Sequence, residues 1–119
     1  MARIVKFTGT VEWPLEDGQP AAKLPLACEL TYTSSLQLEK VFATTVVDEV
    51  IALPMISAKF LVLKALTNDV SVKLNGGAEG IVIKAGTGFM LVWNADGAIT
   101  GLKVSVATVP ATLKGYAFA

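Results

Sequence analysis

The feature that most constrains the fold of this chain is a succession of short segments rich in Val, Ile and Leu, separated by turn-forming residues. Segments such as 70–74 and 81–83 are too short for ordinary helices, and their β-branched residues favour strands. The turns between segments include Asn75-Gly76-Gly77 and Asp96-Gly97, which are strong tight-turn signals. The pattern therefore predicts an all-β chain.

Apolar residues alternate with polar or small residues in most of these segments, as expected of strands with one buried face. The expected strands lie within 4–11, 24–32, 36–42, 44–53, 58–66, 70–74, 81–83, 89–93, 99–106 and 113–118. The acidic pair Asp48-Glu49 predicts a sheet edge or a bulge, because edges are commonly protected by charge. Nine to ten short antiparallel strands in 119 residues predict a jelly-roll-like β-sandwich, with residues 1–119 as a single domain.

The second half of the chain carries a weak internal repeat. Shifting residues 60–77 by twenty places aligns them with 80–97, with six identities in eighteen positions. A duplication explains this match, and so do two successive hairpins of equal length that use the same residue types. In both cases, a regular meander is expected in the C-terminal half.

Charge and composition narrow the function classes. Ten basic and ten acidic residues give a net charge of zero, and the lysines are spread singly. We expect no nucleic-acid ligand, because binding to phosphates requires a basic surface. Hydrophobic residues make up 53% of the chain and charged residues 17%, which is apolar for a small soluble monomer. We therefore expect a homo-oligomer that buries part of this surface between subunits.

The N-terminal residues Met1–Lys6 contain no apolar stretch typical of a secretion signal. No run of about 18 apolar residues occurs, so no membrane span is expected. These features predict synthesis in a cytoplasm, with any later exit as part of an assembly.

Catalytic side chains are scarce. The chain has no histidine, so Ser-His-Asp and Cys-His arrangements cannot form, and its single cysteine excludes an internal disulfide and a zinc site. Cys28 lies in an alternating segment and is expected to be a buried structural thiol. Gly86-Thr87-Gly88 reads as a turn, because no helix pattern follows it. We expect no catalytic residue, no cofactor and no metal.

Three carboxylates lie close together in sequence, beside Trp13: Glu12, Glu16 and Asp17. Two of them could form a glycosidase-like pair or a calcium loop. The spacing fits no EF-hand, and a solvated loop with an anchoring tryptophan explains the same residues. A carboxylate-based hydrolase is therefore the third-ranked hypothesis.

Aromatic residues support two other hypotheses. Trp13, Tyr32, Trp93 and Tyr116 could form a sugar-stacking platform, which makes a carbohydrate-binding or adhesin-like module the alternative function. Trp93 ends an apolar run and is expected to be buried in the core or an interface. Trp13 precedes a proline in a loop and is the best candidate for an exposed anchor, since tryptophan is common at interface hot spots. The candidate interface is Trp13, Pro14, Leu15 and Trp93.

The second half of the chain also has a familiar pattern. It runs from Lys59-Phe60-Leu61-Val62-Leu63 through Asp69–Gly76 and Ala85–Trp93 to Ile99–Val104 and a short closing strand. Residues 58–119 thus resemble the small all-β structural proteins of tailed bacteriophages, which include capsid decoration and other accessory virion proteins. The resemblance is one of pattern, contains no diagnostic motif and carries over no functional residue.

The resemblance implies a homo-oligomeric particle component without enzymatic activity or cofactor. The leading expectation is a non-enzymatic virion structural protein, a capsid decoration or accessory head protein. It would contact copies of itself and other virion proteins of the capsid or tail, and would reside in the virion after synthesis in the host cytoplasm.

Overall fold

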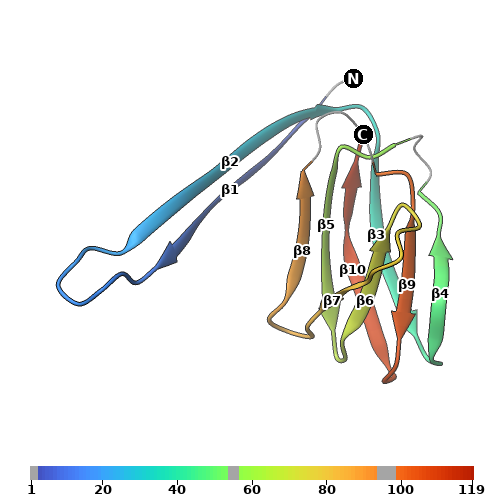
Figure 1. The fold of residues 1–119 in the computed structure, drawn as a ribbon. Helices are drawn as coiled ribbons and strands as arrows, with labels where there is room; N and C mark the ends of the chain where they lie inside the picture. Colours follow the sequence, from blue (N-terminus) through green and yellow to red (C-terminus); the bar gives the residue numbers. More distant parts are fainter. Residues whose placement is uncertain (1–2, 54–56, 94–98) are drawn as a thin grey trace. The chain divides into compact units, whose positions relative to one another are not determined.

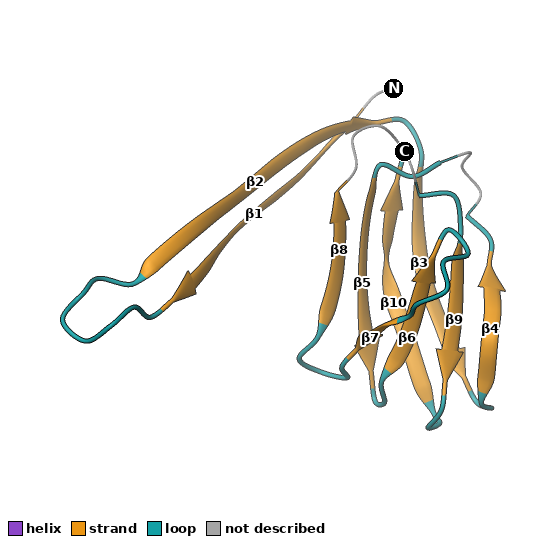
Figure 2. Cartoon of the chain, viewed as in Figure 1, coloured by secondary structure: helices purple, strands orange, loops and turns teal. Residues whose placement is uncertain are grey.

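A computed structural model of the chain describes residues 3–53, 57–93 and 99–119. The described residues are all-β, in antiparallel sheets, as the sequence predicted (Figure 2). The chain divides into two units, Met1–Tyr32 and Thr33–Ala119. The ten strands, labelled in Figure 1, are β1 (Arg3–Trp13), β2 (Ala22–Tyr32), β3 (Ser35–Phe42), β4 (Val46–Ile51), β5 (Phe60–Leu66), β6 (Val70–Leu74), β7 (Ile81–Ile83), β8 (Phe89–Trp93), β9 (Leu102–Val106) and β10 (Ala111–Phe118).

The first unit is one long antiparallel hairpin of β1 and β2. The ladder runs without a break from Arg3, opposite Tyr32, to Trp13, opposite Ala22. The register pairs the odd-numbered residues of β1 with the even-numbered residues of β2. Because most apolar side chains occupy these positions, they share one face of the hairpin. This apolar hairpin face consists of Val5, Phe7, Gly9, Val11 and Trp13 from β1 and Ala22, Leu24, Leu26, Cys28, Leu30 and Tyr32 from β2. The residues on the opposite face are mostly charged or hydroxylated.

The second unit is a sandwich of two four-stranded sheets. Their strand orders are β3-β10-β5-β8 and β4-β9-β6-β7. This order, in which consecutive strands lie in opposite sheets except for the pair β6 and β7, is that of an eight-stranded jelly roll. The jelly-roll expectation is therefore confirmed for this unit.

The core of the sandwich lies between the inward faces of the two sheets. Its fully buried side chains alternate along the strands, as one-face burial requires. The largest are Leu61, Leu63, Leu102, Leu113, Val70, Val72, Val104 and Val106. All residues of this core cluster come from positions 38–119.

The chain has two units, whereas a single sandwich domain over residues 1–119 was expected. All strands of the two sandwich sheets lie between Ser35 and Phe118, whereas β1 and β2 pair only with each other. The alternating pattern of the first 32 residues shows which face of each strand is apolar. It does not show which surface covers that face, so the hairpin could not be separated from the sandwich by pattern alone.

The expected regular meander in the C-terminal half is wrong. β5 and β6 belong to different sheets, and so do β7 and β8; only β6 and β7 form a local pair. The chain turns between the sheets at Thr67 (φ 76°) and at Gly86 (φ 77°), both in the left-handed region. The segments matched by the internal repeat thus lie in opposite sheets, and the end of the second segment, residues 94–97, lies outside the described residues.

Two local predictions are confirmed. β4 is an edge strand, and its pairing with β9 shifts register between Val46 and Glu49. The bulge centres on Asp48, which has a positive φ of 51° and whose backbone amide donates a 3.0 Å hydrogen bond to Ser105 Oγ. Asn75 and Gly76 follow β6 with φ values of 54° and 72°, which makes the predicted tight turn. The Asp96-Gly97 turn signal lies outside the described residues.

Candidate functional site

The apolar hairpin face carries several exposed aliphatic side chains. Val11 is 48% exposed, Leu24 50% and Leu26 42%, although all three lie on the face that a sheet normally buries. A two-stranded hairpin alone is marginally stable in water, because it has no second layer to cover its apolar side. We therefore expect that contact with another surface stabilises the hairpin by covering this face.

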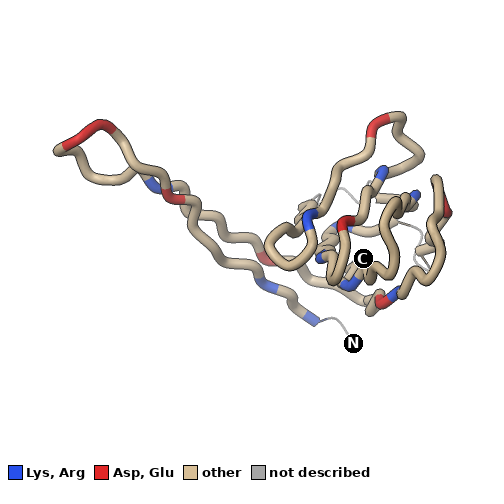
Figure 3. The backbone as a smooth tube through the Cα atoms, turned by 90° about the horizontal axis from the view of Figure 1, so that it is seen from below, with Lys and Arg blue, Asp and Glu red and all other residues tan. Residues whose placement is uncertain are grey.

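The hairpin tip, residues 14–21, joins the two strands. Pro14 and Leu15 are exposed there, and the Gln19 amide donates a 3.1 Å hydrogen bond to the Glu16 carbonyl, which closes a turn around Gly18. Glu16 and Asp17 make the tip acidic, as the red segment at the end of the hairpin shows in Figure 3. The tip thus combines apolar and negatively charged groups.

The outward face of the β3-β10-β5-β8 sheet carries several aromatic rings. The strand register places Phe118, Phe60 and Trp93 side by side, with Tyr116 in the next row. The centre of the Phe60 ring lies 5.7 Å from the centre of the Trp93 ring and 5.8 Å from that of the Phe118 ring. Tyr116 stacks on Phe118, with 6.2 Å between the ring centres. We call these residues, with Val62, Leu91 and Phe89, the aromatic sheet face. The outward face of the other sheet instead carries Ser71, Lys73, Lys103 and Ser105.

A hollow of about 440 Å³ opens on this aromatic sheet face, between β10, β5 and the start of β8. Its walls include Phe89, which is 67% exposed, and Tyr116. Lys64 and Lys114 also line it, and the register places them directly opposite each other on β5 and β10. We call this feature the lysine hollow.

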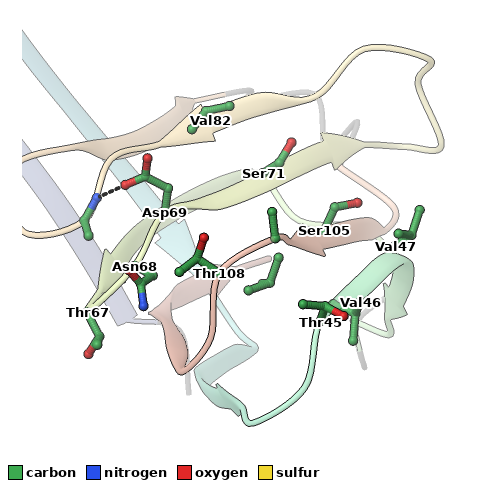
Figure 4. Close-up of a pocket in the computed structure, with 13 residues that line it drawn as sticks. Thr45, Val46, Val47, Thr67, Asn68, Asp69, Ser71, Val82, Ser105 and Thr108 are labelled. Atoms are coloured by element: carbon green, nitrogen blue, oxygen red, sulfur yellow. Dashed lines mark hydrogen bonds between the residues drawn. The ribbon is translucent and has the colours of Figure 1, made fainter.

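A second, larger pocket of about 720 Å³ lies at one end of the sandwich (Figure 4). Hydroxyl groups dominate its polar lining, from Thr45, Thr67, Ser71, Ser105 and Thr108. Its carboxylate is Asp69, whose Oδ1 accepts a 2.9 Å hydrogen bond from the Ala85 amide. Lys84 Nζ donates a 3.0 Å bond to Oδ2 of the same carboxylate.

These contacts explain the titration of Asp69. The backbone hydrogen bond from Ala85, and after it the hydrogen bond from Lys84, lower the pKa of the Asp69 carboxyl below its usual value. A carboxylate held ionised by two donors is suited to tying the two inter-sheet turns together. It is poorly suited to acting as a general acid or base near neutral pH.

The acidic residues considered for a metal or hydrolase site do not converge. Glu12 lies on the polar face of the hairpin opposite Lys23, whereas Glu16 and Asp17 lie in the tip. Within the described part of the chain, no three His, Cys, Asp or Glu side chains form a group that could hold a metal ion. The described residues also contain no helix that is long and apolar enough to cross a membrane.

The candidate interface residues fall into two groups. Trp13 is the last residue of β1 and not a loop residue; it is 43% exposed and adjoins exposed Pro14 and Leu15. Trp93 is half-buried on the aromatic sheet face, against Phe60. The structure therefore joins three of the four residues into one surface and places Trp93 on another.

The four residues of the expected sugar platform also separate. Trp13 and Tyr32 lie on the apolar hairpin face, and Trp93 and Tyr116 lie on the aromatic sheet face. Cys28 is half-buried on the hairpin, opposite Phe7, and is thus less buried than the structural thiol that was expected.

Sequence reasoning missed the lysine hollow. Its two lysines are fifty positions apart, and only the antiparallel register of β5 with β10 places them together. The spacing of the two lysines in the sequence does not predict their proximity, because the local pattern of residues does not determine which strands pair. No protein-family model, curated protein or solved structure matches this chain.

Proposed function

We propose that this protein is a non-enzymatic structural protein that works by assembling with copies of itself and with other proteins of a larger particle. The observation that carries the proposal is the apolar hairpin face. A two-stranded ladder with exposed Val11, Leu24 and Leu26 gains most of its stability when another surface covers it. Exposed apolar surface of this kind marks protein–protein contact sites.

The narrower form of the proposal is a virion protein of a tailed bacteriophage, a capsid decoration or accessory head protein. Two observations support it: the pattern resemblance of residues 58–119, and the jelly-roll strand order, an architecture that capsid proteins use. The fold alone does not decide function, because lectins use the same architecture.

Self-association is tested by measuring the solution mass of the full chain by light scattering after size exclusion, over a dilution series. We expect a species larger than the monomer. Replacing two residues of the apolar hairpin face, Leu24→Ser with Leu26→Ser, is expected to shift it toward monomer. The matched control, Lys23→Ser with Ala27→Ser, alters the opposite face of the same strand and is expected to leave the mass unchanged.

A wild-type chain that stays monomeric at every concentration would overturn the homo-oligomeric part of the proposal. The virion assignment has its own test. An antibody against the protein is used to follow it through density gradients of phage particles released from the source culture. Sedimentation with the particles supports the assignment, and recovery only in the soluble fractions contradicts it.

A second candidate function is favoured by the aromatic sheet face. Exposed Phe89 and Tyr116, which stacks on Phe118, border a hollow of about 440 Å³, and aromatic faces of this kind stack on sugars. A carbohydrate-binding module predicts binding on a glycan array and a ligand-dependent rise in melting temperature, both reduced by Tyr116→Ala. An array without signal at high protein concentration would rule this candidate out.

A further inference from the structure

We propose that the lysine hollow receives the hairpin tip of a second copy of this chain. The inference rests on the proposed function, because it names the surface through which the copies assemble. It would explain both an unusual charge pair on the sandwich and the composition of the tip.

The charge pair is formed by Lys64 and Lys114. They lie directly opposite each other on neighbouring strands, an arrangement in which like charges repel. On the strands that flank this pair, Glu39 of β3 lies opposite Lys114, and Phe89 of β8 lies opposite Lys64. Across the described part of the chain, neither lysine has a carboxylate within 4.0 Å. The row of side chains formed by Glu39, Lys114, Lys64 and Phe89 therefore carries one net positive charge.

The hollow beside these lysines is apolar on its other walls. Phe89 is 67% exposed and Tyr116 41% exposed, so both rings present surface to an incoming group. Gly115, next to Tyr116 on β10, also lines the hollow and contributes no side chain. The matching ligand carries an apolar side chain and at least one anionic group close together.

The hairpin tip has this composition. Leu15 is 46% exposed, and the adjoining Trp13 is 43% exposed. Glu16 and Asp17 follow immediately and are exposed too. Leu15 entering the hollow would bring these two carboxylates toward the two lysines, so the tip and the hollow are complementary in charge and in apolar character.

The contact is tested by disulfide trapping between two single-cysteine proteins. Both carry Cys28→Ser; one also carries Leu15→Cys and the other Phe89→Cys. We expect a covalent dimer after mild oxidation of the mixture, at a yield well above that of either protein alone. A matched control replaces Phe89→Cys with Val82→Cys, an exposed position on the other sheet, and is expected to give little dimer. Melting curves verify that each variant is folded.

Charge reversal provides the second test, read as the dissociation constant from light scattering. Lys64→Glu with Lys114→Glu, or Glu16→Lys with Asp17→Lys, is expected to weaken association by about tenfold or more, and combining all four is expected to restore it. Reversing Lys59 and Lys103 instead is the control. If wild type associates but trapping and reversal have no effect, this inference is wrong and the proposed function stands. If wild type is monomeric, this inference and the homo-oligomeric part of the proposed function are both wrong.

Discussion

The carboxylate of Asp69 accepts a 2.9 Å hydrogen bond from the backbone amide of Ala85, which joins the turn after β5 to the turn before β8. Lys84 completes the arrangement with a 3.0 Å ion pair to the same carboxylate. Both turns carry the chain from one sheet of the sandwich to the other. The contact therefore locks two inter-sheet crossings to each other.

This contact predicts a pH dependence of stability. The Ala85 amide and then Lys84 lower the pKa of the Asp69 carboxyl in the folded chain below its ordinary value of 3.8. The stabilisation is therefore fully present above that value and is lost as the pH falls through the lower, folded pKa. Asp69→Asn is expected to lower the melting temperature at pH 7, and the gap from wild type is expected to close as the pH falls through the folded pKa, which lies below 3.8.

The measurement is thermal unfolding of both proteins from pH 7 downward. Glu79→Gln, which alters an exposed carboxylate in the loop before β7, is the matched control and is expected to follow wild type. A gap that stays constant down to the lowest pH would show that the Asp69 charge is not the source of the stabilisation.

Local pattern was sufficient to predict the strands and their packing as a two-layered β-sandwich. The alternation of apolar residues in segments such as 70–74 and 102–106 gave the inward faces, and Asp48-Glu49 correctly marked an edge with a bulge. These features depend on neighbours in sequence. The jelly-roll expectation held because eight short strands must close into two layers to bury these faces.

Features that depend on distant pairing could not be predicted. The alternation in Leu24 to Tyr32 is the same for a strand of a sandwich sheet and for a strand of a two-stranded sheet, so it does not show that β1 and β2 pair only with each other. The lysine hollow depends on Lys64 facing Lys114 across a ladder fixed by the whole sheet. Trp13 belongs to β1 because it pairs with Ala22 at the end of the ladder. This pairing partner is not evident from the residues next to Trp13 in the sequence.

Gly115 is predicted to tolerate no side chain. β10 passes so close to β5 that a Cβ at this position would collide with the Val62 carbonyl oxygen, which is backbone and cannot move aside alone. Gly115→Ala is expected to destabilise the fold by about 1–3 kcal/mol, the usual cost of overpacking. Urea unfolding measures this change.

The control for this substitution is Gly101→Ala. A Cβ there meets nothing within 4 Å, so the change is expected to be neutral or to stabilise slightly through the unfolded state. Equal effects of the two substitutions would contradict the close approach of β10 and β5.

An ion pair is predicted to protect one open side of the sandwich. Lys40 on β3 and Glu49 on β4 are 3.1 Å apart, and these are edge strands of opposite sheets. Lys40 Nζ also lies 5.6 Å from the centre of the Phe42 ring. Charged side chains that point inward at an edge discourage pairing with other chains.

Both side chains are more than a third exposed, so the coupling energy in a double-mutant cycle with Lys40→Met and Glu49→Gln is expected to be below about 1 kcal/mol. The larger expected effect is on solubility, because the double variant removes both edge charges. Light scattering during prolonged incubation is expected to show faster aggregation than for wild type. A coupling well above that value would mean that the pair is screened from solvent and primarily stabilises the fold.

Residues 33–119 are predicted to fold without the hairpin. Every residue of the sandwich core lies at position 38 or later, and the amides of Thr33 and Ser34 donate to the Ala119 carbonyl within the same unit. A chain of residues 33–119 is expected to give the same amide hydrogen-exchange protection in β5, β9 and β10 as the full chain. A peptide of residues 1–32 is expected to be largely unfolded in water, because a lone hairpin has no second layer to cover its apolar face. Loss of cooperative unfolding in the shorter chain would show instead that the hairpin belongs to the folding unit of the sandwich, and that the boundary at Tyr32 is one of geometry alone.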